Sequence, residues 1–212
     1  MPSLAHLAAT ASLDLYFERT IIGMPAKLRN NQTAGGLFVN LCRLTDKALR
    51  EYEAARNLLN QYRSASGQPV VNPQAIDHME NCVEATHRAV LSAKGLRDDI
   101  GLRIKSLAVT TKQVDDLRLL RNRLIHIDEK LVQSRIRPGQ HFSLMLTEKR
   151  IEISDRNLTY QQLANAITKC HRTIEKIRGR PTTAPPPVRS GDQSVRLSPI
   201  FAEVLGRVLT QL

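Results

Sequence analysis

Residues 41–62, LCRLTDKALREYEAARNLLNQY, determine the fold class that the sequence predicts. Apolar side chains recur in this stretch at every third or fourth position, which is the period of one face of an α-helix. The pattern therefore predicts a long helix over residues 36–63. Its apolar face consists of Leu41, Leu44, Ala48, Tyr52, Ala55, Leu59 and Tyr62.

Helical patterns also lie on both sides of this stretch. Residues 4–22 predict a first helix that ends at the breaker Gly-Met-Pro at 23–25. Another helix opens near Pro73, and its apolar pattern continues to Ile104. Two glycines near the end of that pattern predict a kink or a break there. A further apolar pattern predicts a helix over residues 112–133.

The period changes to two between residues 142 and 153, where apolar residues alternate on both sides of the polar tip Glu-Lys-Arg. This alternation predicts one small β-hairpin, which is the only strand signal in the chain. Thr159 and Gln162 then have the spacing of a capping box, and the apolar residues that follow predict a helix to about Arg178.

The C-terminal part of the chain has a different composition. Residues 179–194 contain four prolines and no periodic apolar residue, which predicts an extended linker over residues 179–197. Residues 198–212 predict one amphipathic helix. We expect it to dock on the body or on a sister subunit; the alternative is a surface-membrane anchor, which is less favoured because the polar face of the helix carries few basic residues. The sequence thus predicts an all-α, up-and-down bundle of four to five helices over residues 1–178, with the hairpin and an appended C-terminal helix.

Charge points to a polyanionic partner. Lys and Arg number 31 against 20 Asp and Glu, which gives a formal net charge of +11. Such a surface attracts nucleic acid. The aromatic share is only 4% and Trp is absent, so a platform of stacked aromatic rings for single-stranded bases is not expected.

The cysteines favour a reducing, cytoplasmic setting. Cys42, Cys82 and Cys170 lie far apart in the sequence, and none of them forms the close pair that a zinc site or a redox dithiol needs. The N-terminal residues lack the basic region of a secretory signal. We find no run close to the ~20 apolar residues of a membrane span.

The candidate functional side chains are concentrated in residues 114–131, VDDLRLLRNRLIHIDEKL. At about 100° per residue, Leu117, Leu120, Leu124, Ile127 and Leu131 form one face of the expected helix. Asp115, Arg118, Asn122, His126 and Glu129 fall on the opposite face. His126 is therefore expected to be exposed and not to belong to the core.

Three neighbouring side chains of this helix suit phosphodiester chemistry. Asn122 and His126 are four residues apart, so the amide could fix the orientation or tautomer of the ring. Arg121 lies on the border between the two faces. Imidazole can move protons and guanidinium can stabilise the charge of a pentacoordinate phosphate, so these groups could cleave a phosphodiester without a metal.

The segment RNRLIH at 121–126 matches R-N-x-x-x-H, a common form of the R-x(4–6)-H signature of the HEPN superfamily. The chain resembles HEPN proteins over about residues 35–178, and its pattern is closest to those of toxin–antitoxin and defence systems. The resemblance implies a helical bundle that dimerises so that two motifs face each other. It also implies a metal-independent endoribonuclease without a cofactor.

Carried over to this chain, the resemblance implies that Arg121 and His126 form the active site with their symmetry mates, supported by Asn122. The neighbouring Arg118 and Arg123 are predicted to bind the RNA backbone. RNA, a second copy of the chain and an antitoxin or another protein are the expected partners, and no membrane is expected.

One position departs from the related toxins, and two alternatives stay open. The toxins that nucleotidyl-transferase antitoxins silence carry a tyrosine two residues after the histidine, where this chain has Asp128. Regulation by modification of that tyrosine is therefore in doubt, and the effect of Asp128 and Glu129 on catalysis is undecided. The alternatives are a catalytically silent module that binds RNA or protein, and a helical interaction or scaffold protein.

Other candidate residues have simpler interpretations. His78 and His87 are nine residues apart and are expected to be ordinary, partly exposed histidines, not metal ligands. Cys170 and His171 are adjacent and so point about 100° apart on a helix. Gly35 and Gly36 could present amides to a phosphate, but such a pair usually forms a loop.

Overall fold

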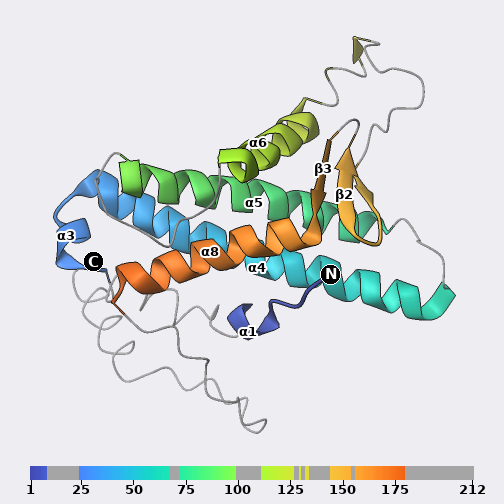
Figure 1. Ribbon diagram of the computed structural model, residues 1–212, viewed down its shortest axis with the longest axis horizontal. Helices are drawn as coiled ribbons and strands as arrows, with labels where there is room; N and C mark the ends of the chain where they lie inside the picture. The colour runs from blue at the N-terminus through green and yellow to red at the C-terminus, as the bar shows by residue number, and fades with distance from the viewer. Residues whose placement is uncertain are drawn as a thin grey trace, which may run out of the picture.

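The computed structural model describes residues 1–8, 24–66, 72–98, 111–126, 129, 132–133, 144–153 and 156–179 (Figure 1). Most of these residues are helical, and the strands form one small antiparallel sheet. The predicted all-α class with a small β element is confirmed. The linker and the C-terminal helix lie outside the described residues, as does the predicted first helix beyond Ala8.

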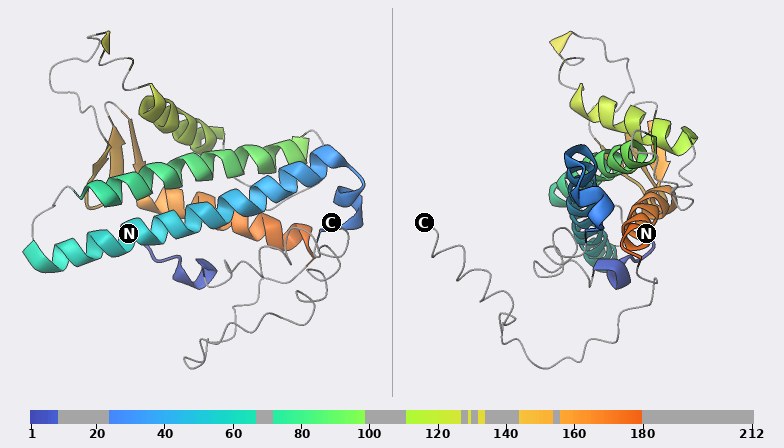
Figure 2. Two further views of the ribbon diagram at one scale, coloured as in Figure 1. Left: turned by 180° about the vertical axis from the view of Figure 1, so that it is seen from behind. Right: turned by 90° about the vertical axis from the view of Figure 1, so that its left-hand side faces the viewer.

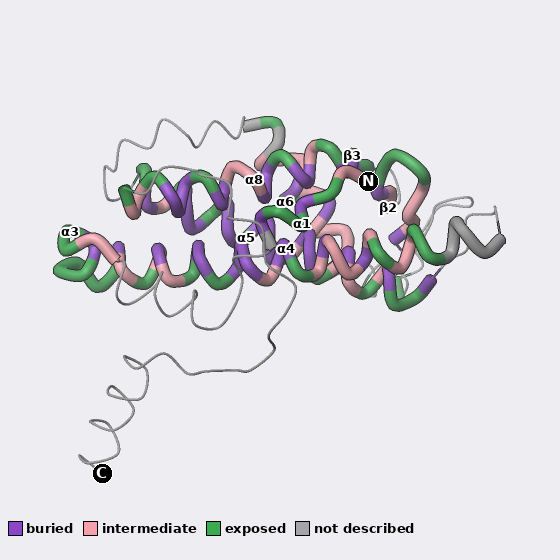
Figure 3. The backbone as a smooth tube through the Cα atoms, turned by 90° about the horizontal axis from the view of Figure 1, so that it is seen from below, coloured by how far each residue is buried: buried purple, intermediate pink, exposed green. Residues whose placement is uncertain are grey.

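Three long helices form the body. Helix α4 (Gln32–Ser66) and helix α5 (Pro73–Asp98) run antiparallel along most of their length, and α8 (Tyr160–Ile177) packs against both (Figures 1 and 2). Figure 3 shows that buried residues recur along the sides of these helices that face one another. The short helices α1 (Ala5–Ala8) and α3 (Ala26–Arg29) lie against α4.

The apolar face predicted for the first long helix is the face that α4 buries. Leu41, Leu44, Ala48, Tyr52 and Ala55 are all buried, and Leu59 is half-buried. Burial of this stripe against α5 and α8 removes several large side chains from water at about 25 cal/mol per Å² of apolar surface. This burial helps to hold the three long helices together.

Helix α4 begins at Gln32, earlier than the sequence pattern predicts, because Asn31 caps it. The Asn31 side-chain oxygen accepts a hydrogen bond from the Ala34 amide at 3.0 Å. The Gly35 amide donates to the Asn31 carbonyl at 2.8 Å, so this glycine belongs to the first turn of the helix and not to a phosphate-binding loop. A Cβ atom at Gly35 would lie 3.3 Å from the Leu28 carbonyl oxygen, so glycine lets α3 approach α4 closely.

Helix α5 begins where the sequence predicts. Asn72 caps it by accepting hydrogen bonds from the Gln74 amide at 2.9 Å and the Ala75 amide at 3.3 Å, and Pro73 fills the first helical position. The helix continues through Gly95 to Asp98, so the expected break does not occur at Gly95. The later part of that apolar pattern, with Ile104, lies outside the described residues.

The sheet has one strand more than the sequence predicts. Strands β1 (Met145–Leu146) and β2 (Arg150–Ile153) form the predicted hairpin, and β3 (Arg156–Thr159) pairs antiparallel with β2. The sequence RNLT of β3 contains a single apolar residue, Leu158, which is buried opposite Ile151. A strand with one inward apolar side chain has no alternation to detect, so this strand was missed.

Helix α8 confirms the prediction at both ends. The Thr159 hydroxyl accepts a hydrogen bond from the Gln162 amide, and the Gln162 side chain accepts one from the Thr159 amide, which together form the predicted capping box. The helix ends at Ile177 with Arg178 as its C-cap, and Gly179 follows with a φ of 71°. A left-handed residue just past the last turn is a common helix terminator, and glycine adopts that conformation without strain.

Candidate functional site

Helix α6 (Thr111–Ile125) carries the candidate residues. It lies on the outer side of α5, on the face away from α4, and it also packs against β3 (Figure 2). Leu117 and Leu120 are buried and Leu124 is half-buried, so this part of the predicted apolar face is confirmed. Ile127 and Leu131 lie outside the described residues. The opposite side of α6 faces solvent.

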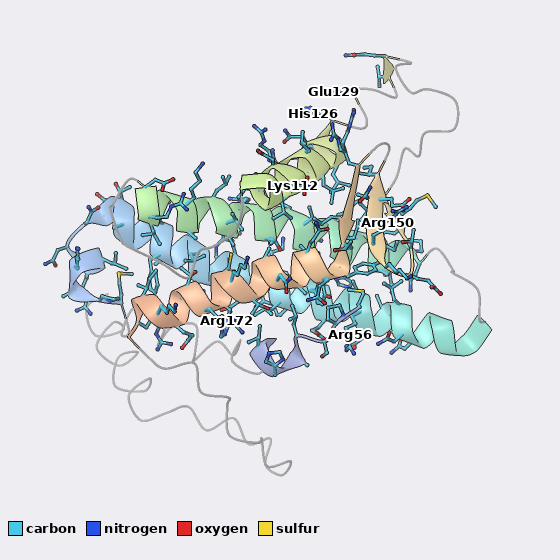
Figure 4. All side chains as sticks on the ribbon, in the orientation of Figure 1. Arg56, Lys112, His126, Glu129, Arg150 and Arg172 are labelled. Atoms are coloured by element: carbon cyan, nitrogen blue, oxygen red, sulfur yellow. The ribbon has the colours of Figure 1, made fainter. Side chains whose placement is uncertain are left out.

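His126 occupies the turn directly after α6, and 49% of its side chain is exposed, as predicted. Its Nδ1 atom lies 3.1 Å from a carboxylate oxygen of Glu129 (Figure 4). A carboxylate at Nδ1 fixes the ring and favours the tautomer that carries the proton on that nitrogen. The other ring nitrogen, Nε2, is then the acceptor that a substrate could use.

The ring of His126 forms part of an open hollow of about 390 Å³, which we name the His126 hollow. Both α6 and β3 contribute to its wall. The charged and titratable groups among its described lining residues are two guanidiniums, one imidazole and one carboxylate. The residues that line it are Leu119, Asn122, Arg123, His126, Glu129, Gln133 and Arg156.

Arg121 turns to the other side of α6. Its Nε atom lies 2.9 Å from a carboxylate oxygen of Glu84 on α5, and 32% of its side chain is exposed. It lines a second open hollow of about 490 Å³, which we name the α5–α6 groove, together with Asp77, Glu80, Asn81, Glu84, Leu124 and Ile125. Within one chain, Arg121 and His126 therefore belong to different hollows.

Asn122 lines the His126 hollow but has a different partner from the one expected. Its side-chain oxygen accepts a hydrogen bond from Arg121 at 3.3 Å, whereas the contact to Nδ1 of His126 is made by Glu129. Glu129 thus takes the orienting position that the sequence interpretation gave to Asn122. The structure thus gives Glu129 a contact with the ring, while its effect on catalysis stays a prediction.

The two arginines predicted to bind RNA are separated. Arg123 lines the His126 hollow. Arg118 is exposed and lies outside both hollows, where its guanidinium is 3.2 Å from Asp115 in the preceding turn of α6. The structure therefore brings Asn122, Arg123 and His126 together and directs Arg118 and Arg121 elsewhere.

His87 was expected to be partly exposed, and this expectation is wrong. Only 6% of the residue is exposed, and among the described residues neither ring nitrogen has a hydrogen-bond partner. Burial lowers the pKa of this histidine, the charges of Arg121 and Arg118 lower it further, and Glu84 acts in the opposite direction. The ring therefore lies beside the interface of α5 with α6 and favours its neutral form.

His78 contacts a carboxylate, and the thiols of Cys82 and Cys170 are buried. His78 is partly exposed, as predicted, and its Nδ1 lies 2.7 Å from Glu51. Burial raises the pKa of the Cys82 and Cys170 thiols to about 12, so neither is a reactive thiolate. In the part of the chain that the structure describes, no three histidine, cysteine or carboxylate side chains are grouped as a metal site.

No protein-family model matches the chain, and no curated protein or solved structure is significantly similar to it. Its function is therefore inferred from the geometry of its own residues. None of the described helices combines the length and the apolar character needed to cross a membrane. The His126 hollow is the place where proton transfer and anion binding could occur together, since it holds an oriented imidazole and two guanidiniums.

Proposed function

We propose that the chain is a metal-independent endoribonuclease of the HEPN type that cleaves RNA as a homodimer. The observation that carries the proposal is the half-exposed ring of His126, which Glu129 holds through Nδ1 in a hollow that also contains Arg123 and Arg156. An oriented imidazole next to guanidiniums supplies proton transfer and phosphate binding in one place.

The reaction that suits these groups is attack by a ribose 2′-hydroxyl on the adjacent phosphorus. The 2′-oxygen forms a bond to phosphorus while the bond to the 5′-oxygen of the next nucleotide breaks. Nε2 of His126 takes the proton of the 2′-hydroxyl, and Glu129 stabilises the imidazolium that forms. The 5′-oxygen gains a proton from water or from the second copy of His126, which leaves a 2′,3′-cyclic phosphate and a 5′-hydroxyl.

The proposed enzyme is a dimer because Arg121 does not line the His126 hollow of its own chain. A second copy could bring its Arg121 to this hollow, where the guanidinium would stabilise the negative charge of the transition state. By resemblance, such an enzyme is a toxin or defence component with an antitoxin or another protein as a further partner. We place it in the cytoplasm, where its three free cysteines stay reduced.

One observation favours a second candidate, a catalytically silent module that binds RNA or protein. The Arg121 guanidinium is already paired with Glu84 across the interface of α5 and α6. In this role the motif arginine connects two helices and does not meet the phosphate. The excess of basic residues would still attract RNA.

The test is cleavage of a mixed RNA pool by the purified full chain in EDTA, with analysis of the fragment ends. We expect cyclic-phosphate ends from the wild type and none from His126→Ala. Because His126 is exposed, the variant should keep its free energy of unfolding within about 1 kcal/mol, as measured by urea denaturation. His78→Ala is the matched control, since this histidine is also partly exposed and paired with a glutamate but lies outside the hollow.

Other outcomes contradict the nuclease. RNA that is bound but not cleaved by the wild type would favour the silent module. Cleavage that EDTA abolishes would indicate a metal-dependent reaction. Equal activity of wild type and His126→Ala would show that the catalyst is another group or a contaminant.

A further inference from the structure

Among the described residues that line the His126 hollow, Arg156 is the charged group that comes from the sheet. It begins β3 and pairs with Ile153 of β2, so two strands determine where its backbone lies. The residue is not part of the R-N-x-x-x-H motif. It is nevertheless brought to the same hollow as the motif histidine.

The strand geometry explains how this side chain reaches the hollow. Residues two apart on a strand point to the same face, so Arg156 shares a face with Leu158. Leu158 is fully buried and fixes that face toward the helices, where α6 packs against β3. Arg156 stands at the end of the strand, where the same face opens to solvent. A rigid sheet therefore supports one side of the hollow, and the end of α6 supports the other.

Basic groups outnumber carboxylates among the described residues that line the His126 hollow. Arg123, His126 and Arg156 are its basic groups, and Glu129 is the one carboxylate among the described lining residues. A guanidinium offers paired N–H donors that match two oxygens of a phosphate. The amides of Asn122 and Gln133 add donors without adding charge.

We propose that Arg156 and Arg123 form a binding site for one RNA phosphate beside Nε2 of His126. The proposal rests on the proposed function for the identity of the ligand, and it adds a residue of the sheet that positions the phosphodiester. Two guanidiniums from different elements fix both the place and the orientation of the phosphate relative to the ring.

The experiment measures binding apart from cleavage. The probe is a fluorescent oligoribonucleotide with 2′-O-methyl groups throughout, which cannot be cleaved by 2′-hydroxyl attack. Anisotropy titrations of the full chain at several salt concentrations give its affinity. We expect Arg156→Ala to bind about tenfold more weakly and to reduce the salt slope by about one, as for the loss of one phosphate contact.

Arg150→Ala is the matched control. Arg150 lies on the same sheet and is exposed, but it stands opposite Thr159, at the other end of the β2–β3 pair from Arg156, and is paired with Glu152 (Figure 4). Removal of its charge should change the affinity less than twofold. Arg156→Lys should recover only part of the affinity, because an ammonium keeps the charge and loses the fork of donors.

The measurements distinguish a failure of the phosphate site from a failure of the proposed nuclease activity. Equal affinities of Arg156→Ala and Arg150→Ala would overturn the phosphate site, even where the wild type still cleaves natural RNA. Specific loss of binding in Arg156→Ala, in a chain that cleaves no RNA, would keep the phosphate site and reject the nuclease. Loss of helical circular dichroism in Arg156→Ala would show a structural role and is checked first. In that case Arg156→Gln replaces it, and unchanged binding by a folded Arg156→Gln would overturn the site.

Discussion

His87 combines a titratable ring with an environment that has no hydrogen bond for it among the described residues. The ring is buried beside Arg121, Arg118 and Glu84. Burial of an unpaired polar group costs about 1–3 kcal/mol. We therefore expect His87→Leu, which places an apolar side chain in the same space, to raise the free energy of unfolding by about 1 kcal/mol near neutral pH.

The same environment gives a pH dependence with a definite sign. Burial lowers the pKa of His87 in the folded chain from its ordinary value of 6.5, which the unfolded chain keeps. As the pH falls below that value, the unfolded state takes up the proton first, so stability decreases. Urea unfolding between pH 7.5 and 5.5 should show a steeper loss for the wild type than for His87→Leu.

The control for this experiment is His78→Leu on the same helix. His78 is partly exposed and paired with Glu51, so its replacement leaves the environment of His87 unchanged. This variant should keep the steep loss of stability toward low pH. Identical pH profiles of the wild type and His87→Leu would contradict the inference that the buried ring stays neutral in the folded state.

For single residues, the sequence predicts the exposure of a side chain better than it predicts the side chain's contacts. The helical period of α6 was enough to place His126 outside the core, because neighbours on a helix face follow from spacing alone. The contact of Arg121 with Glu84 joins residues on different helices, and only the packing of α6 on α5 decides it. The burial of His87 depends on that same packing, so it could not be read from the pattern of α5.

Elements were predictable where local chemistry sets their ends. Helix α8 has a capping box at its start and a left-handed glycine just after its end, and both signals lie within a few residues of the boundary. Helix α4 starts at Gln32 because Asn31 caps it, although two glycines in its first turn weaken the sequence signal. Strand β3 exists because β2 provides a partner, which a four-residue segment cannot show on its own.

The capping box of α8 should contribute to the stability of the folded chain. Thr159 ends β3 and caps α8, so its hydroxyl supports the junction that holds the sheet against the helix. Thr159→Ala should lower the free energy of unfolding by about 1 kcal/mol, the usual effect of losing an N-cap side chain. Thr159→Ser keeps the hydroxyl and should stay within a few tenths of a kcal/mol of the wild type.

Urea denaturation followed by circular dichroism measures both variants. Gln162→Ala adds a second arm, because the Gln162 side chain accepts the hydrogen bond of the Thr159 amide in return. The double variant should lose less free energy of unfolding than the two single variants lose together, because each residue supports the hydrogen bond of the other. Equal stability of Thr159→Ala and Thr159→Ser would show that the cap contributes nothing to the folded chain.

At the scale of the whole molecule, the proposed enzyme needs more than one chain. Arg121 is held by Glu84 in the α5–α6 groove, whereas His126 lines a different hollow. In the proposed enzyme, a phosphate in the His126 hollow would contact Arg123 and Arg156 of the same chain, and it would meet an Arg121 only from another copy. The sequence motif contains both Arg121 and His126, but it does not indicate which chain of a dimer supplies each of them to one site.

Complementation between two inactive chains tests this arrangement. Arg121→Ala and His126→Ala are co-expressed with different affinity tags, and the heterodimer is purified through both tags. If one cleft uses groups from both chains, the heterodimer retains one Arg121 and one His126 and should cleave RNA where neither homodimer does. The readout is the formation of cyclic-phosphate ends in EDTA. Light scattering must first show that the wild type is a dimer, because a monomer would already contradict the shared site.

A heterodimer of wild type and His126→Ala, purified in the same way, separates the remaining explanations. If it is active while the complementing pair is inactive, each chain needs its own Arg121 together with its own His126. Helix α6 would then have to release Arg121 from Glu84 when RNA binds, since the two groups lie in separate hollows of the free chain. If Arg121→Ala alone keeps full activity, the guanidiniums of Arg123 and Arg156 suffice for the transition state, and Arg121 serves to hold α6 on α5.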